Sequence, residues 1–314
     1  MTGGAAVGLA LIGAGPWGRN YIKAIEACPG GRLVALGSRN PEARALVISN
    51  CQVFADWRDA IAGPGVDGVV IATPPAIHTE IALAAIAAGR GVLIEKPLAL
   101  SFAEAQSIAE AAAKLDRPVM VDHIHLHHPA FIALRQMLPK LGPLRSIEAE
   151  AGRLGPFRPD TSVLWDWGPH DVAMSLAVVG ADPVSLRAQA QQKQTPAGLG
   201  ETVDLELIFA EGVHARVRLS NVMEQRVRRF KVTCARGWAV YDSVGDQPLL
   251  VKLGSQAPQA IATDDRRPLD GIVAAFCAAL ALRRATPGDV GLGVRVVGVL
   301  THCERALSGP SITP

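Results

Sequence analysis

The sequence predicts an N-terminal α/β domain with a doubly wound parallel sheet, followed by an α+β domain with a large, mostly antiparallel open sheet. Three observations predict this architecture. A glycine-rich turn follows the apolar run Val7–Ile12, short apolar runs alternate with Ala-rich stretches to about residue 120, and extended segments dominate thereafter. The 314 residues are 49% hydrophobic and 19% charged, which allows two cores. We place the first domain at residues 1–122 and the second at residues 123–314.

In the first domain, β-branched or Leu-rich runs of strand length are separated by stretches of helix length. This alternation implies parallel pairing in a doubly wound sheet. Gly89 is placed to end one helix, and Ser101 with Glu104 three residues later predicts a capping box at the start of the next. The predicted strands are Val7–Ile12, Arg32–Gly37, Gly68–Ala72, Gly91–Ile94 and Pro118–Val121, and the predicted helices are Trp17–Ala27, Pro41–Ser49, His78–Ala88 and Phe102–Leu115.

The second domain is predicted to be rich in strands. A helix is expected after Pro129, and Glu211-Gly212 between two alternating segments predicts a hairpin turn. Residues 191–200 are the best candidate for a mobile loop, and two helices, Leu269–Arg284 and Leu292–Leu307, close the chain. The predicted extended segments are Leu144–Ala151, Val184–Gln192, Thr202–Ala210, Val213–Asn221, Arg226–Cys234, Trp238–Asp242 and Leu249–Leu253.

Composition and charge argue against several functional classes. The formal net charge of +2 and the absence of a basic run give no footprint for a nucleic acid. The alternating cations Arg226, Arg228, Arg229 and Lys231 are interpreted as the solvent face of a strand. The apolar stretches are too short to span a bilayer, and the N-terminus has no basic segment of a signal peptide. Five scattered cysteines without metal or redox spacing favour a reduced, cytoplasmic protein.

The turn Gly13-Ala14-Gly15-Pro16-Trp17-Gly18 predicts a dinucleotide site. Gly13 permits the tight strand-to-helix turn, Gly15 lets the backbone approach a pyrophosphate, and Gly18 lets the helix pack closely on the strand. The helix N-terminus then offers free N–H groups to the phosphates. Pro16 and Trp17 belong to the same predicted cofactor site. A strand precedes the motif and a helix follows it, which is the context of a Rossmann domain.

Two further strand ends extend the predicted cofactor site. The second strand ends in Ser38-Arg39 rather than in an acidic residue, and Arg39 can pair with a 2′-phosphate, so NADP is favoured over NAD. The alternative for Arg39 is an ordinary exposed arginine of a loop. Thr73-Pro74 ends the central strand at the edge of the sheet where ligands bind, and His78 either caps the next helix or lines the nicotinamide side.

Glu95-Lys96-Pro97 places a lysine at the end of a predicted strand of the same domain. The carboxyl edge of the sheet aims the ammonium towards a substrate cleft, where it can stabilise negative charge developing on a substrate oxygen. Glu95 is expected to orient Lys96 or its loop. The alternative for Lys96 is an ordinary surface lysine.

A second constellation is Trp165-Asp166-Trp167-Gly168-Pro169-His170-Asp171. Pro169 is expected in the first turn of a helix, and Asp166 and His170, four residues apart, share one face. A carboxylate beside an imidazole holds its tautomer, and a histidine that titrates near neutrality can remove a hydroxyl proton. The alternative for His170 is a structural histidine. Asp171 is expected either in a structural ion pair or in contact with a substrate hydroxyl.

Four histidines, His123, His125, His127 and His128, follow the last strand of the first domain. Alternate histidines on a strand could suggest zinc, but no carboxylate or cysteine has matching spacing, so no metal site is predicted. We interpret this segment as a polar wall of the cleft with one substrate contact, from His123.

With both constellations in place, the chain resembles the Gfo/Idh/MocA family of oxidoreductases. The resemblance rests on Gly13 to Gly18, the Thr73-Pro74-Pro75 turn with His78, Glu95-Lys96-Pro97, and Asp166 with His170, in family order. A narrower resemblance, to the UDP-N-acetylhexosamine and hexosaminuronate 3-dehydrogenases, rests on Trp17-Gly18 with Asn20, His123 ahead of Pro129, and Arg153-Leu154-Gly155 leading to Val163-Leu164-Trp165-Asp166 with Gly168-Pro169-His170-Asp171. The chain departs from that branch at Pro16, in place of an aromatic residue, at Asp122, where glycine is common, and at His125–His128, where aromatic residues are usual.

The resemblance implies an NAD(P)-dependent enzyme that oxidises a secondary alcohol of a sugar, sugar nucleotide or polyol, or reduces the ketone. It matches Lys96, Asp166 and His170 to the catalytic positions and places Arg153, Arg158 and Trp165 near the substrate. Ser38-Arg39 resembles the NADP-using relatives. Two alternatives are a nucleotide-binding regulator without activity, and an enzyme that uses a tightly held cofactor for transient oxidation, such as a redox-assisted glycosidase or an aldose oxidoreductase. The open sheet face is expected to be apolar and to form a homo-oligomer, a dimer or tetramer.

Overall fold

The computed structural model describes residues 6–48, 50–158, 161–282 and 289–308. The chain forms two compact units, one of Met1–Ile124 with Arg266–Val297 and the other of His125–Asp265 with Gly298–Pro314. Both units are therefore discontinuous in sequence, whereas the predicted division at residue 122 is continuous. As functional domains, 1–122 and 123–314 remain a prediction.

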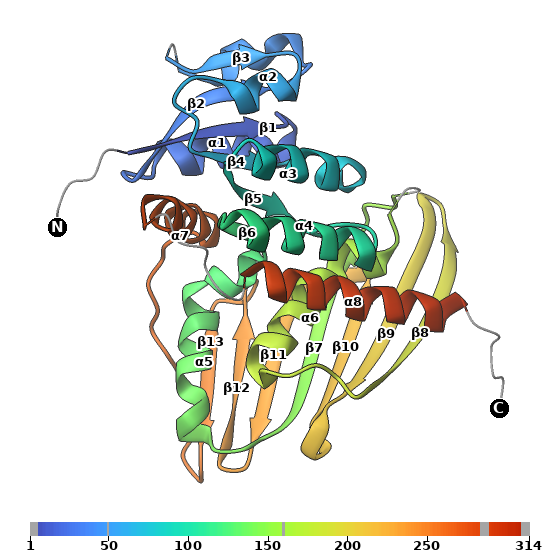
Figure 1. Cartoon of the computed structure of the whole chain (residues 1–314). Coiled ribbons are helices and arrows are strands. Elements are labelled where there is room, and N and C mark those ends of the chain that lie inside the picture. The colour runs from blue at the N-terminus through green and yellow to red at the C-terminus, as the bar shows by residue number, and fades with distance from the viewer. Residues whose placement is uncertain (1–5, 49, 159–160, 283–288, 309–314) are drawn as a thin grey trace. The chain divides into compact units, whose positions relative to one another are not determined.

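The first unit is built on a six-stranded sheet in the order β3-β2-β1-β4-β5-β6, and all its strands are parallel (Figure 1). Successive strands run outwards from β1 in both directions, which confirms the predicted doubly wound sheet. The five predicted strands are confirmed to within one residue at each end, and the short β3 was not predicted. The strands are β1 (Val7–Ile12), β2 (Gly31–Gly37), β3 (Gln52–Phe54), β4 (Gly68–Ile71), β5 (Gly91–Glu95) and β6 (Val119–Asp122).

Most helices of this unit begin and end where the sequence places them. The Ser101 hydroxyl accepts the Glu104 N–H at 3.2 Å, which confirms this cap, and Gly89 adopts a φ of 76° just after α3. The predicted helix at 41–49 is a 3₁₀ turn instead, and Ser49, like the predicted end of the helix 269–284 at Arg284, lies outside the described residues. The helices are α1 (Pro16–Glu26), α2 (Trp57–Ala62, not predicted), α3 (His78–Ala87), α4 (Phe102–Leu115) and α7 (Pro268–Leu282), with 3₁₀ turns η1 (Pro41–Leu46) and η2 (Pro75–Ile77).

Helix α7 comes from the far end of the sequence yet belongs to the core of this unit. Its Ile272, Val273 and Phe276 are fully buried in one cluster with residues of β1, β2 and α1. On the same helix, the Cys277 thiol lies 4.0 Å from the thiol of Cys28, which follows α1. Helix α7, which the sequence analysis assigned to the second domain, therefore completes the hydrophobic core of the first unit.

The second unit contains an eight-stranded sheet in the order β14-β13-β12-β11-β7-β10-β9-β8. Among the strands that the structure describes in this sheet, only β7 and β10 pair in parallel, so the predicted mostly antiparallel sheet is confirmed. Its strands are β7 (Leu144–Leu154), β8 (Ser185–Thr195), β9 (Gly198–Ile208), β10 (His214–Ser220), β11 (Val222–Cys234), β12 (Gly237–Asp242), β13 (Leu249–Leu253) and β14 (Gln259–Ala260).

Two turns of this sheet test the sequence interpretation. Glu211 and Gly212 have φ values of 60° and 77° and join β9 to β10, as predicted. The predicted loop at 191–200 is wrong, because β8 and β9 pair from Gln191↔Thr202 to Thr195↔Gly198. Backbone pairing therefore continues to the tip of this hairpin.

Helices cover one face of the sheet (Figure 1). Helix α6 packs on β7, β9 and β10, and α5 packs on β12 and β13. The helices are α5 (Pro129–Leu141), α6 (Val163–Val179) and α8 (Asp289–Ser308), with 3₁₀ turns η3 (Ile124–His127) and η4 (Ala210–Gly212). Among the helices of the described ranges, none is long and apolar enough to cross a membrane.

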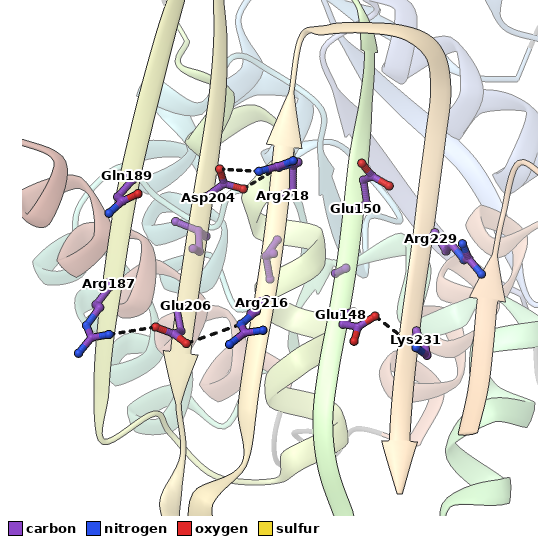
Figure 2. Close-up of a pocket in the computed structure, with 13 residues that line it drawn as sticks. Glu148, Glu150, Arg187, Gln189, Asp204, Glu206, Arg216, Arg218, Arg229 and Lys231 are labelled. Atoms are coloured by element: carbon purple, nitrogen blue, oxygen red, sulfur yellow. Dashed lines mark hydrogen bonds and ion pairs between the residues drawn. The ribbon is translucent and has the colours of Figure 1, made fainter. Parts of the chain in front are cut away.

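The opposite face of the sheet is charged, so the predicted apolar face is wrong. Arg218 pairs with Asp204 at 2.8 Å, and Lys231 with Glu148 at 3.3 Å (Figure 2). The alternation of side chains places the apolar residues under the helices and leaves the charged residues outside. This face holds a hollow of about 680 Å³, lined by Glu148, Ala149, Glu150, Arg187, Gln189, Asp204, Leu205, Glu206, Arg216, Val217, Arg218, Arg229 and Lys231.

Candidate cofactor and active site

The turn after β1 has the shape of a phosphate cradle. A Cβ atom at Gly13, where φ is 103°, would lie 2.4 Å from the Ala72 carbonyl oxygen. A Cβ atom at Gly18 would lie 2.0 Å from the Gly13 carbonyl oxygen, so neither position accepts a side chain. By contrast, nothing among the described residues lies within 4 Å of a Cβ atom at Gly15. A ligand can therefore approach the backbone directly at Gly15.

The start of α1 provides the donors of this cradle. Gly15 is the N-cap residue and has no side chain to bind the helix start, and Pro16, the first helical residue, has no N–H. The first intrahelical bond is donated by Arg19 to Gly15, so the amides of Trp17 and Gly18 have no acceptor within the helix. These residues fit a pyrophosphate, which takes N–H donors at a positive helix end. The Trp17 side chain is 45% exposed beside them.

The end of β2 carries the two predicted adenosine-side residues. The Ser38 hydroxyl accepts the Asn40 N–H at 3.2 Å, and its own proton stays available as a donor. The Asn40 side chain in turn accepts the Glu42 N–H and caps η1, which fixes this loop. Arg39 is exposed. Since β2 lies next to β1 in a parallel sheet, Ser38 and the glycine turn share the carboxyl edge.

His78 supports the loops after β4 and β5 from within. It is fully buried, and its two ring nitrogens lie 2.9 Å from the carbonyl oxygens of Thr73 and Pro97. Burial lowers the pKa of His78, which favours the neutral ring. The predicted helix cap is wrong, because Ile77 is the N-cap residue and α3 has no side-chain cap. His78 joins the end of the Thr73 loop to the loop of Lys96.

Thr73 itself faces the glycine turn. Its Cγ2 would lie 3.3 Å from a Cβ atom at Gly13, and its buried hydroxyl has no hydrogen-bond partner among the described residues. Pro74, next to it, is exposed. A buried hydroxyl without a partner, beside a turn open to ligands, fits a cofactor contact.

Lys96 follows the last residue of β5 and is partly buried. Its N–H donates to the carboxylate of Glu95 at 3.2 Å. Glu95 is buried and lies in register with Asp122 on β6. The Glu95 side chain therefore binds the backbone of the lysine loop, as expected of an orienting residue.

The predicted acid/base residues lie at the start of α6. The Ser162 hydroxyl caps the helix through the Trp165 N–H at 3.4 Å, and Asp166 falls in the first turn. His170 lies one turn further along. Pro169 is the seventh residue of the helix, so its predicted place in the first turn is wrong. The cap at Ser162, four residues before Asp166, begins the helix earlier than the proline suggests.

Other predicted substrate residues are already engaged. The indole N–H of Trp165, a residue 7% exposed, donates to Glu304 at 2.8 Å. The guanidinium of Arg153 donates to the Gly155 carbonyl at 3.2 Å. Arg158 is exposed, and its Nε lies 3.8 Å from a carboxylate oxygen of Asp166. His123, in the first unit, is buried. Of this group, Arg158 is the cation that lies beside Asp166.

His125, which the sequence analysis placed in the polar wall of the cleft without a contact of its own, is a neighbour of His170. The two rings meet edge to face with centroids 4.9 Å apart, and the Nδ1 atom of His125 lies 2.7 Å from the Tyr241 hydroxyl. His125 and Tyr241 are 116 positions apart in sequence. Burial raises the pKa of Tyr241, which keeps it neutral. The sequence signals for His125 were its place among the four histidines after β6 and the departure from aromatic residues there.

Asp171 forms a buried ion pair with Arg228 of β11. The two groups are 2.6 Å apart, and neither side chain is more than 6% exposed. Burial raises the pKa of Asp171, and the guanidinium opposes that rise. The interpretation of Arg228 as part of a solvent face is wrong, because Arg228 is buried on the helix-covered face. Its guanidinium carbon lies over the Trp167 ring, 5.3 Å from the ring centroid. Contact of Asp171 with a substrate hydroxyl remains a prediction.

A stability experiment separates the two roles of Asp171. Arg228→Met leaves a buried carboxylate without its partner, and we expect the free energy of unfolding to fall by about 3 kcal/mol. The double variant Asp171→Leu with Arg228→Met removes both charges and is expected to unfold close to wild type in urea. Turnover restored together with stability confirms a structural pair, whereas a stable but inactive double variant assigns Asp171 to the substrate.

Known proteins share these features of sequence and fold. The profile of the Gfo/Idh/MocA oxidoreductase family with an NAD-binding Rossmann fold matches residues 7–123, and that of the Gfo/Idh/MocA C-terminal domain matches residues 132–240. A UDP-N-acetylglucosamine 3-dehydrogenase of Acidithiobacillus ferrooxidans is 33% identical over 71% of this chain and 69% of its own length. An inositol 2-dehydrogenase of Saccharopolyspora erythraea is 28% identical over 59% and 57%, respectively. A solved structure from Magnetospirillum magnetotacticum MS-1 has a TM-score of 0.88 with 42% identity and covers 95% of this chain and 100% of that one.

Proposed function

Because this chain belongs to the Gfo/Idh/MocA family of oxidoreductases, we propose that it transfers a hydride between NAD(P) and a secondary alcohol or ketone of a sugar, sugar derivative or polyol. The observation that carries the proposal is the open backbone at Gly15, with uncapped amides at the start of α1. The names of the relatives supply the substrate class, a hydroxyl-bearing carbon of a sugar nucleotide or a polyol.

The glycine turn, Thr73 and the loop of Lys96 would hold the cofactor, which supplies or accepts the hydride when it is bound. In the direction of oxidation, the His170 imidazole takes the proton of the reacting hydroxyl. The Lys96 ammonium stabilises the negative charge that develops on the same oxygen. Asp166, one turn before His170, orients the ring and favours its protonated form. That Lys96 and His170 act on one substrate is part of the proposal.

A turnover screen tests the activity. The protein is incubated with NADP or NAD and a panel of hexoses, UDP-N-acetylhexosamines and inositols, and absorbance of the reduced cofactor is followed. Steady turnover with at least one member is expected. Tight cofactor binding without any turnover would instead favour a regulator, and a single burst of reduced cofactor would favour transient oxidation by a retained cofactor.

Arg39 sets the preference for NADP in this proposal. Its planar guanidinium, exposed on the loop after β2, can make charge-assisted bonds to a 2′-phosphate. Arg39→Ala is expected to raise the Kd for NADP about tenfold and to leave that for NAD within about twofold. Fluorescence titration measures both, with exposed Arg135→Ala as the control for a lost surface charge. Equal weakening for the two cofactors would show that Arg39 does not contact the 2′ position.

We assign the protein to the cytoplasm and to a homo-oligomer. All five cysteines are free thiols, as is usual in a reducing compartment. The open sheet face carries interleaved acidic and basic side chains, so a second copy in a two-fold arrangement could match unlike charges across it (Figure 2). Light scattering after size exclusion gives the subunit number.

A further inference from the structure

Two carboxyl groups lie side by side beneath the loop of Lys96. Glu95 ends β5 and Asp122 ends β6, and the parallel register pairs them directly. They are only 8% and 1% exposed. The hydroxyl of Tyr21, fully buried on α1, donates to one oxygen of Asp122 at 2.6 Å. An apolar sheet edge thus holds two acids, one phenol and the amide of Lys96.

Ionising both of two adjacent buried carboxyl groups costs free energy, because the two negative charges repel each other and neither is solvated by water. The Oε1 atom of Glu95 and the Oδ1 atom of Asp122 are buried and have no hydrogen-bond donor among the described residues. A proton held between the two side chains supplies the missing donor. Burial, and then the neighbouring Asp122, raise the pKa of Glu95, and burial raises that of Asp122 to about 6.

Among the described residues, the other titratable groups that act on the pair are Tyr21 and Lys96. Tyr21 approaches from α1, and the Lys96 ammonium favours ionisation of both acids. Burial and the two acids raise the pKa of Tyr21, so that it remains a neutral donor. One proton on the pair therefore leaves one negative charge, which matches the single positive charge of Lys96.

We propose that Glu95 and Asp122 share one proton and act as a single anion that positions Lys96, with Asp122 as the positioning residue. The inference rests on the proposed function, because Asp122 acts through the lysine. Asp122 contacts neither substrate nor cofactor in this proposal.

The pair makes stability depend on pH. Both acids have a higher pKa when folded than when unfolded, so the folded state holds protons more tightly. Stability contributed by the second proton of the pair is present below about pH 4 and is lost as the pH rises through about 6, whereas the shared proton is held to higher pH. Asp122→Asn removes the step near pH 6, and its melting temperature relative to wild type is expected to be higher at pH 8 than at pH 4.

Carboxyl titration by ¹³C NMR, without cofactor or substrate, tests the shared proton directly. Wild type is expected to show one carboxyl of the pair protonated at pH 7. Asp122→Asn should lower the titration midpoint of Glu95 by about one pH unit, and Lys96→Met should raise the midpoints of the pair by a similar amount. Exposed Asp59→Asn is the matched control and should change neither. Tyr21→Phe provides a second variant of the same network if Asp122→Asn unfolds.

Turnover then links the pair to Lys96. Asp122→Asn is expected to lower kcat about tenfold, to shift one limb of its pH profile by about one unit, and to change KM less than twofold. Two ordinary carboxylates, both ionised at pH 7, or an unchanged profile in a folded Asp122→Asn variant, would overturn the proposal. A fully active Lys96→Met variant would refute the proposed function, while the NMR result would still report whether the proton is shared.

Discussion

Replacing Lys96 with methionine is expected to lower kcat/KM about a thousandfold. Methionine keeps the length of the side chain but removes the cation that stabilises the substrate oxygen, and loss of such a group costs about two to three powers of ten in rate. The partly buried position after β5 restricts access of water, which strengthens the effect of the charge. Initial rates with saturating cofactor and varied substrate measure it.

The exposed Lys114→Met, in the last turn of α4, is the control for a lost surface lysine and should retain the wild-type rate. The cofactor Kd of the Lys96 variant should change much less than kcat/KM. A variant that keeps more than a tenth of the wild-type activity on the identified substrate would remove Lys96 from the chemistry.

Replacing His170 with glutamine is expected to lower kcat by about a thousandfold, because general acid–base catalysis contributes two to four powers of ten. Glutamine can hydrogen-bond the substrate hydroxyl but cannot accept its proton at neutral pH. The limb of the pH–rate profile that reports ionisation of the histidine should disappear. A substrate deuterated at the reacting carbon should then show whether hydride transfer limits the rate.

His302→Gln, at an exposed position of α8, serves as the matched control. Asp166→Asn should give a smaller loss with the limb still present but displaced, since the carboxylate acts through His170. An unchanged pH profile in His170→Gln would identify the residue as structural, which is the alternative that its sequence context allows.

Local signals in the sequence predicted much of the first unit. The glycine turn, the Ser101 cap and the strand ends depend on a few neighbouring residues, whose conformational preferences are properties of the residues themselves. The same holds for the Glu211-Gly212 turn. The short β3 and α2 were missed because three and six residues carry too little periodicity.

Contacts between distant segments could not be predicted in this way. Alternation along β11 shows that its side chains point to opposite faces, but it does not say which face the helices cover. Arg228 was therefore assigned to solvent, although it binds Asp171, 57 positions earlier. The contacts of His125 with His170 and Tyr241 likewise depend on the fold. At the candidate site, the glycine turn and the loop of Lys96 could be predicted from the sequence. The hydrogen-bond partners of His78 and Trp165 could not.

The place of α7 in the first unit bears on how the protein is made. Synthesis on the ribosome delivers residues 6–122, with all six parallel strands, well before residues 268–282 emerge. Until then, the apolar surface that Ile272 and Phe276 cover stays open to water or to chaperones. A gene fragment ending after β6 would thus encode every strand of the dinucleotide fold and still lack part of its interior. Boundaries for expressing a nucleotide-binding fragment must include this late helix.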